Sequence, residues 1–281
     1  MSNNNDLSNR INECYSKLSK GQKRLATYIT DNYDKAVFMT AAKLGEVVGV
    51  SESTVVRFAM HLGYKGYPEF QSALEELVRN KLNSLQRMEV TYGRINQSKI
   101  LESVLKADAQ RIESSLEKID ENAFELAVDT ILNARDIYII GIRSCAPLAN
   151  FMAFYFTLIF EHVHLIQTSS SSEIFEQMVR IGKEDVIIGI SFPRYSMRTL
   201  KAMEFANNRS AKVITLTDSV HSPMNLYSSC NLIAESDMAS IVDSLVAPLS
   251  VINALIVALC MKKQGEVATT LEMLEEIWDE Y

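Results

Sequence analysis

The sequence predicts two domains of different class: an all-α domain, and after it an α/β domain built on a five-stranded parallel sheet. Three observations support this prediction. The first eighty or so residues carry apolar side chains at helical spacing. Beyond residue 136, short apolar runs alternate with segments long enough for helices, which is the pattern of βαβ units. The length of 281 residues is also more than one typical compact domain needs.

The N-terminal domain is expected to be a set of helices. In the first of them Leu18, Leu25, Ile29 and Tyr33 recur mainly at helical spacing. The segment after the last helix has no proline, one glycine and many charges up to residue 120, which predicts a helical connector. The expected helices cover residues 18–33, 39–48, 51–62 and 68–82.

The second domain is expected to have helices on both faces of its sheet, because its strands are apolar throughout. Its expected strands are residues 137–141, 163–167, 186–191, 213–217 and 232–235, followed by helices over 243–261 and 267–281. The resulting division is a helical domain over 1–78, a connector over 79–119, the α/β domain over 120–262 and a C-terminal helix over 263–281.

Charge is distributed unevenly along the chain. The net charge of −7 argues at first against a nucleic-acid partner. Residues 1–82, however, hold 11 Lys and Arg against 9 Asp and Glu, a net +2, whereas the remaining residues hold 17 against 26, a net −9. Any surface that binds a polyanion is therefore expected in the first third of the chain.

Several features predict a soluble, cytoplasmic protein without a cofactor. No stretch reaches the roughly 20 apolar residues of a membrane span, and the start MSNNNDLSNR lacks the apolar core of a secretion signal. Cys14, Cys145, Cys230 and Cys260 lie far apart and form no C-x-x-C pair. We therefore expect reduced thiols, and neither a metal site nor a disulfide.

The segment around Gly49 fits a helix-turn-helix. Gly49 can adopt the left-handed conformation that the turn needs, and Gly45 is small where the two helices cross. Ser51 is a good N-cap for the second helix. The inner face of the pair is expected to contain Leu44, Val48, Val50, Val55 and Phe58.

The outer face of the second helix has the chemistry of a DNA-reading surface. Hydroxyl groups near a helix N-terminus reach phosphates and bases, and a guanidinium makes two hydrogen bonds to guanine. Lys65 follows the helix, where backbone phosphates would lie. An ordinary helical hairpin with a solvated outer face is the alternative on spacing alone. The candidate DNA-binding residues are Ser51, Ser53, Thr54, Arg57, His61 and Lys65.

Polar residues follow nearly every strand of the second domain. Ligands of parallel α/β sheets gather at these strand ends, where helix N-termini favour anions. Serine and threonine are also common helix caps, so each hydroxyl alone has a structural explanation, but together with two arginines they indicate an anion site. The candidates are Arg143, Ser144, Ser191, Arg194, Ser196 and Thr217, with the serine run 169–172.

Two sets of motifs resemble a known family. The run TAAKLGEVVGVSESTVVRFAMHLGYKGYPEFQSAL, preceded by LSKGQKRLATYI, closely resembles the N-terminal domain of the RpiR/MurR family of bacterial transcription regulators. DIYIIGIRSCA, EDVIIGISFPRYS, AKVITLTDSVHSP and DSLVAP resemble the SIS (sugar isomerase) domain that this family carries. The resemblance implies a helix-turn-helix DNA-binding domain over 1–78 and a phosphosugar-binding SIS domain over 120–262.

The sequence departs from the usual SIS loops at three positions. The first loop usually reads G-x-G-x-S, and here Arg143 replaces the second glycine. The phosphate loop usually reads S-x-S-G-x-T; Ser191 and Ser196 hold its ends, while Pro193 and Arg194 replace the middle serine and the glycine. Proline donates no backbone hydrogen bond, whereas Arg194 can supply two charged ones. Arg143 reinforces that charge, or points to solvent or across a dimer interface.

The resemblance implies a transcriptional regulator of sugar or amino-sugar catabolism genes, whose DNA affinity a sugar phosphate changes. Its expected partners are double-stranded DNA, the sugar phosphate and further copies of the chain, as a homodimer or tetramer through the SIS domain and the apolar face of 250–261. The alternatives are a sensor of an unphosphorylated sugar or polyol, and a sugar-phosphate isomerase. The isomerase needs a general base, for which the candidates are His162, His164, His221 and Glu173.

Overall fold

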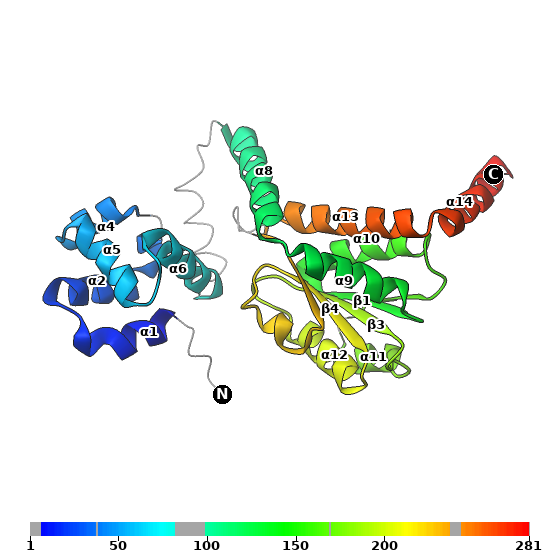
Figure 1. Cartoon of the computed structure of the whole chain (residues 1–281), viewed down its shortest axis with the longest axis horizontal. Coiled ribbons are helices and arrows are strands. Elements are labelled where there is room, and N and C mark those ends of the chain that lie inside the picture. Colours follow the sequence, from blue (N-terminus) through cyan, green and yellow to red (C-terminus); the bar gives the residue numbers. More distant parts are fainter. Residues whose placement is uncertain (1–6, 38, 82–98, 169, 237–242, 281) are drawn as a thin grey trace. The chain divides into compact units, whose positions relative to one another are not determined.

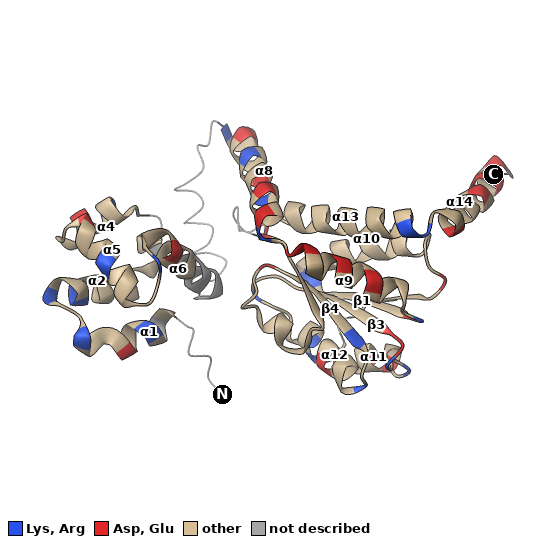
Figure 2. Ribbon diagram, viewed as in Figure 1, with Lys and Arg blue, Asp and Glu red and all other residues tan. Residues whose placement is uncertain are grey.

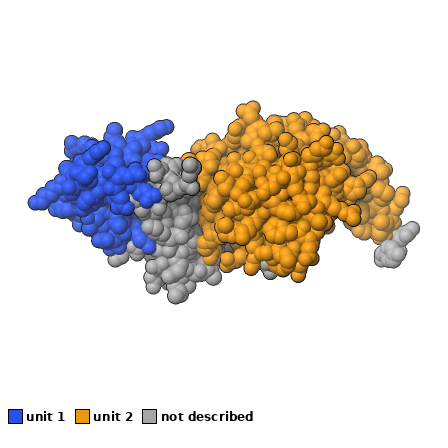
Figure 3. Space-filling model, turned by 90° about the horizontal axis from the view of Figure 1, so that it is seen from below, with its two compact units in different colours: residues 1–94 blue, residues 95–281 orange. Residues whose placement is uncertain are grey.

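The computed structural model describes residues 7–37, 39–81, 99–168, 170–236 and 243–280. The chain divides into two compact units, residues 1–94 and 95–281 (Figure 3). The first unit is helical and the second is α/β with a five-stranded parallel sheet, which confirms the predicted fold class. Of the predicted connector, residues 82–98 lie outside the described residues, and residues 100–118 form a helix of the second unit, as the prediction of a helical segment requires there.

The first unit packs its helices around one apolar core (Figure 1). Ser19 begins the second helix with a capping box, in which its side chain and that of Gln22 each bind the other's backbone N–H. That helix ends before Asn32, whose φ of −135° is not helical, so the predicted helix over 18–33 is too long. The helices are α1 (Leu7–Cys14), η1 (Tyr15–Lys17), α2 (Lys20–Asp31), α3 (Tyr33–Ala36), α4 (Ala41–Val48), α5 (Glu52–His61) and α6 (Tyr67–Lys81).

The second unit has the strand order β2-β1-β3-β4-β5, with every neighbouring pair parallel. The last strand begins two residues earlier than predicted, because Asn231 is accommodated in it by a hydrogen bond of 2.8 Å from the Thr215 hydroxyl. The strands are β1 (Ile137–Gly141), β2 (Val163–Ile166), β3 (Val186–Ile190), β4 (Lys212–Thr217) and β5 (Cys230–Ile233).

Helices cover both faces of this sheet (Figure 1). On one face α9 (Glu121–Leu132), α10 (Ala146–Phe156) and α13 (Val246–Lys262) form the larger core with the sheet. On the other face lie α11 (Ser171–Gln177), α12 (Met197–Asn208) and η4 (Pro223–Tyr227). The unit also contains α8 (Ile100–Lys118), η3 (Arg143–Cys145) and α14 (Gln264–Glu280).

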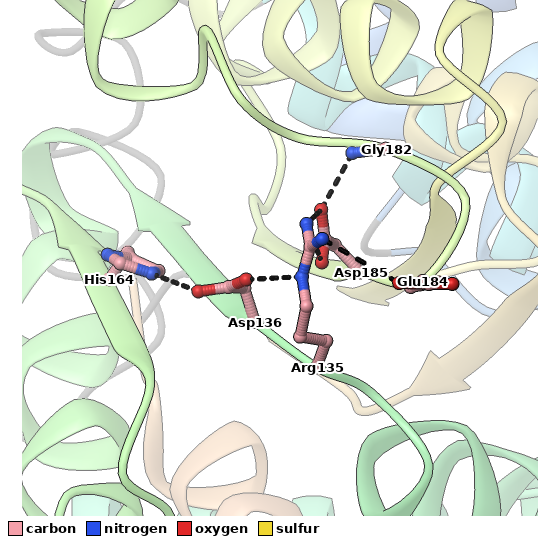
Figure 4. A network of polar contacts seen from close by, with 6 residues as sticks. All are labelled: Arg135, Asp136, His164, Gly182, Glu184 and Asp185. Atoms are coloured by element: carbon pink, nitrogen blue, oxygen red, sulfur yellow. Dashed lines mark hydrogen bonds and ion pairs between the residues drawn. The ribbon is translucent and has the colours of Figure 1, made fainter.

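An ionic cluster ties together the edge at which the strands begin (Figure 4). Arg135 binds Asp136 at 2.8 Å and Asp185 at 2.9 Å, and His164 of β2 binds the other oxygen of Asp136 at 2.7 Å. Burial raises the pKa of Asp136, but its hydrogen bonds with His164 and Arg135 outweigh burial and hold that pKa below its usual value. The cluster therefore links β1, β2 and β3 at the edge opposite the predicted anion site.

Among the described residues, no single helix is long and apolar enough to cross a membrane; α13 and α14 pass that test only as a pair, which is bent by 98°.

Candidate functional site

The turn between α4 and α5 has the geometry of a helix-turn-helix. Gly49 ends α4 in the left-handed conformation, with φ of 73°. A Cβ on Gly45 would lie 2.7 Å from the carbonyl oxygen of Val50, so only glycine lets the two helices approach this closely. Leu44, Val55 and Phe58 are fully buried beneath the turn, as the inner-face prediction requires.

Three hydroxyl groups and one arginine meet at the start of α5. Ser51 occupies the N-cap position, but its hydroxyl caps no backbone N–H and instead binds the hydroxyls of Ser53, at 3.0 Å, and Thr54, at 2.8 Å. Arg57 Nε donates to the Ser53 carbonyl oxygen at 3.2 Å, which orients the guanidinium along the exposed face of the helix. These four candidate DNA-binding residues thus form one polar cluster, in which Thr54 is half-buried and the other three are exposed.

The other two DNA-binding candidates lie differently. His61 Nδ1 is 2.9 Å from Nε2 of the buried Gln22, so its ring joins the end of α5 to α2 and has a structural role there. Lys65 is exposed, and its backbone N–H donates to the carboxylate of Glu69. Its ammonium group has the accessibility that a phosphate contact requires.

The helix α2 has a basic surface that was not predicted from the sequence (Figure 2). Lys20, Lys23 and Arg24 line a groove of about 740 Å³ with Tyr28 and Val48. A Cβ on Gly21 would lie 3.7 Å from Cγ2 of Thr54, so the start of α2 lies beside the start of α5. Arg24 also donates to the carbonyl oxygen of Gly49 at 3.0 Å. The stretch SKGQKR could have indicated this surface, because its cations are three and four residues apart and so lie on one face of a helix.

In the second unit, a pocket of about 130 Å³ lies between the loops that follow β1 and β3. These strands are neighbours, and the helices after them, α10 and α12, cover opposite faces of the sheet. Such a switch point is where parallel α/β sheets bind ligands. Five predicted effector residues come together there, and the lining is Ile142, Arg143, Ser144, Cys145, Ser191, Phe192, Pro193, Arg194 and Ser196.

Both arginines in this pocket adopt a backbone conformation that favours glycine. The φ of Arg143 is 61° and that of Arg194 is 71°. A non-glycine residue in this region costs roughly 1–2 kcal/mol. Each loop therefore places a cationic side chain at a left-handed position, which glycine would adopt without this cost. Strain of this kind tends to persist at functional sites, where the surrounding structure enforces it.

The loop after β3 is held by its own serines. The backbone N–H of Ser196 donates to Oγ of the buried Ser191 at 3.0 Å. Ser196 caps α12, accepting from the Thr199 N–H at 3.2 Å. Both hydroxyls keep their own hydrogen for a ligand. The N-terminus of α12 faces the same loop, and its dipole favours an anion.

The charges of the two arginines are not equivalent. Arg194 pairs with Asp243, with 3.1 Å between NH2 and Oδ2. Arg143 is exposed and has no hydrogen-bond or ion-pair partner among the residues that the structure describes. Asp243 was not predicted, because it comes from the segment between β5 and α13, 49 residues away from Arg194. The pocket lining therefore has two positive charges, one of which is paired with Asp243, a residue outside the lining.

Thr217 was predicted as an effector residue, but it does not lie at the pocket. It is fully buried, and its hydroxyl binds Ser222 at 2.9 Å and Asp218 at 3.2 Å, so it does not line the pocket. Of the serine run, Ser169 lies outside the described residues, and Ser170 occupies the N-cap of α11. Among the described residues, the side chains of β4 and of the loop after β2 therefore contribute nothing to this lining.

None of the four general-base candidates lines the pocket. His164 belongs to the cluster at the opposite edge of the sheet, and Glu173 binds the hydroxyl of Thr168. The one titratable group besides the arginines is Cys145, and burial raises the pKa of its thiol. The described residues also include no group of three or more His, Cys, Asp or Glu side chains that could hold a metal ion.

Arg143→Gly is expected to raise the free energy of unfolding by up to about 1 kcal/mol, because glycine removes the left-handed strain while adding some entropy to the unfolded chain. Ser210→Gly is the matched control, since Ser210 has φ of 65° and lies outside the pocket. Calorimetric unfolding should show both variants to be stabilised, while only Arg143→Gly weakens anion binding. A lower free energy of unfolding for Arg143→Gly than for the wild type would show that the backbone of Arg143 is not strained.

Comparison with known proteins agrees with this division of the chain. Residues 5–81 match the family described as helix-turn-helix domain, rpiR family, and residues 130–258 match the SIS domain. An HTH-type transcriptional regulator of Clostridium perfringens is 26% identical over 225 residues, which make up 77% of each chain. The segment 5–81 contains the turn around Gly49, and the segment 130–258 contains the pocket residues.

Two solved structures share the fold. The sugar isomerase domain of an RpiR transcription factor from Sphaerobacter thermophilus has a TM-score of 0.61 at 21% identity and covers 63% of this chain and 99% of its own. The Vibrio vulnificus NanR protein, complexed with ManNAc-6P, has a TM-score of 0.60 at 20% identity and covers 98% of this chain and 99% of its own.

Proposed function

The chain belongs to the rpiR family of HTH-type transcriptional regulators that carry a SIS domain, and on this premise we propose that a sugar phosphate bound in the SIS pocket changes its affinity for DNA. The observation that carries this proposal is the pair of left-handed arginines with three serines at the switch point of the sheet. The genes it controls are proposed to serve sugar or amino-sugar catabolism. The protein is proposed to act in the cytoplasm, where it meets DNA.

The DNA contact is assigned to the first unit. Ser51, Ser53, Thr54 and Arg57 are proposed to enter the major groove, as the N-terminal residues of a recognition helix do. The cations of α2 and Lys65 are proposed to contact phosphates. The basic surface of α2 lies beside the N-terminus of α5, which supports this arrangement.

The effector is assigned to the pocket after β1 and β3. Its volume of about 130 Å³ fits the anionic group of a sugar phosphate, with the sugar itself outside the closed part. Ser144, Ser191 and Ser196 are proposed to donate hydroxyl hydrogen bonds, and Arg143 and Arg194 to supply charge. The NanR structure, with its bound ManNAc-6P, supports a sugar phosphate over a free sugar or polyol.

We propose binding without catalysis. A sugar-phosphate isomerase needs a general base beside the reacting carbons, and no histidine or carboxylate lines the described pocket. A thermal-shift screen with phosphorylated and free sugars tests the ligand class, because a ligand at 100 times its dissociation constant stabilises the native state by about 2.7 kcal/mol. A coupled isomerase assay with each stabilising sugar should show no turnover. Turnover would establish the enzyme instead.

The active form is proposed to be a homodimer or tetramer assembled through the SIS unit. Val257 and Met261 of α13 are 57% and 66% exposed, and Phe154 of α10 is 62% exposed. Light scattering at micromolar concentration is expected to give at least the mass of a dimer, since paired reading helices contact half-sites about one DNA turn apart. Val257→Glu should lower that mass. A monomeric wild-type chain would refute the assembly.

A further inference from the structure

The partner of Arg194 does not come from the loops that line the anion pocket. Asp243 lies between β5 and α13, and its carboxylate holds NH2 of Arg194 at 3.1 Å. The Asp243 side chain is 11% exposed and that of Arg194 is 39% exposed. An anion that enters the pocket must therefore share this guanidinium with a carboxylate that is already bound to it.

The residue after Asp243 makes a hydrogen bond to α8. The hydroxyl of Ser244, which is 8% exposed, donates to Oδ1 of Asp108 at 2.7 Å. The same oxygen accepts from NH1 of Arg111 at 2.9 Å. Asp108 and Arg111 both belong to α8, the first described helix after residues 82–98, which connect it to the helix-turn-helix unit. The short segment 243–244 thus joins the pocket arginine to the helix that leads to the DNA-binding unit.

A second attachment of α8 is independent of the pocket. Near the C-terminal end of the helix, the hydroxyl of Ser114 donates to Glu235 at 2.8 Å, and the hydroxyl of Ser115 accepts from the Glu235 N–H at 2.8 Å. Lys118 also pairs with Glu235. These contacts involve neither Asp243 nor Ser244, so they offer a matched control.

We propose that Asp243 is a built-in competitor of the effector anion for Arg194, and that its release is passed to α8 through Ser244 and Asp108. This rests on the proposed function of the pocket and names the residues that regulate it. A ligand shifts a conformational equilibrium only as far as it binds the two states differently. The exchange of one carboxylate for the ligand's anion supplies that difference. The pair is partly exposed and hence weak, so a ligand with several oxygens displaces it.

The test uses the full chain and inorganic phosphate, at constant ionic strength. In calorimetric titrations, Asp243→Asn is expected to bind phosphate about threefold to tenfold more tightly than the wild type, because the competing charge is gone. Ser244→Ala is expected to bind phosphate within twofold of the wild type, because it leaves the pocket intact. Coincident thermal unfolding of each variant with the wild type verifies that it is folded.

Hydrogen exchange of peptides from residues 100–118 tests the second step. Phosphate is expected to speed exchange around Asp108 at least twofold in the wild type, and to have no effect there in Ser244→Ala. Ser114→Ala should keep the response. This response in α8 is the coupling evidence that spatial proximity alone does not supply.

Different results would overturn the competitor role of Asp243, the relay to α8 and the anion site itself. Equal or weaker phosphate binding by Asp243→Asn overturns the competitor role and leaves the proposed anion site standing. A full α8 response in Ser244→Ala, or none in the wild type at saturating phosphate, overturns the relay. If neither the wild type nor Asp243→Asn binds phosphate, both this inference and the proposed function of the pocket are refuted.

Discussion

Arg57→Ala is expected to weaken binding to operator DNA by about 1–3 kcal/mol and to relax the preference at one base pair. Arg57 projects from the exposed face of α5, and its contact with the Ser53 carbonyl oxygen orients the guanidinium. A guanidinium held in this way can make two hydrogen bonds to the edge of a guanine, which no phosphate contact replaces. Gel shifts measure both effects when they use the DNA upstream of the gene that encodes this protein, together with versions of that DNA that carry single base-pair changes.

Lys65→Ala is the matched control for this prediction. Lys65 is exposed after the end of α5, so its loss should weaken binding to all DNA sequences about equally. The slope of log K against log salt concentration should become shallower by about 0.9, the value of one phosphate contact. A uniform loss in Arg57→Ala would instead place Arg57 on the phosphate backbone. No loss at all would refute α5 as the reading helix.

Arg194→Ala is expected to weaken the anionic effector at least tenfold, which corresponds to about 1.4 kcal/mol. The substitution removes a charged donor and also leaves Asp243 without this partner at the edge of the pocket, where its charge repels an anion. Calorimetry with the sugar phosphate that stabilises the wild type most measures the loss. DNA binding without effector should stay unchanged, because the first unit is untouched.

Arg180→Ala is the charge-matched control, because Arg180 is exposed after α11 and does not line the pocket. It should bind the effector as the wild type does. Equal affinity in Arg194→Ala would refute the role of that arginine. Tighter binding of the uncharged sugar than of its phosphate would favour a sensor of an unphosphorylated ligand.

Much of the fold could be predicted because its signals are local. The strands β1 and β3 are continuous apolar runs, and they are fully buried in the structure. The helix α1 was missed because LSNRINEC offers only Leu7, Ile11 and Cys14 as apolar residues, and its place depends on packing against distant helices. Local pattern alone does not reveal such a tertiary contribution.

The pocket could be predicted in part for the same reason. The rule that ligands gather at strand ends located Arg143, Ser191 and Arg194 without knowledge of any contact. It also selected Thr217, which turned out to be a buried residue with its own hydroxyl partner. Asp243 could not be found, because its relation to Arg194 exists only once α13 has folded over the sheet.

The central claim is that the effector and DNA are coupled through this chain. The most direct measurement is the dissociation constant for operator DNA at fixed salt, with and without a saturating sugar phosphate, together with that of the sugar phosphate with and without DNA. The account predicts that each ligand changes the affinity of the other by the same factor, about 5 to 150. An unchanged DNA affinity at full occupancy of the pocket would contradict it.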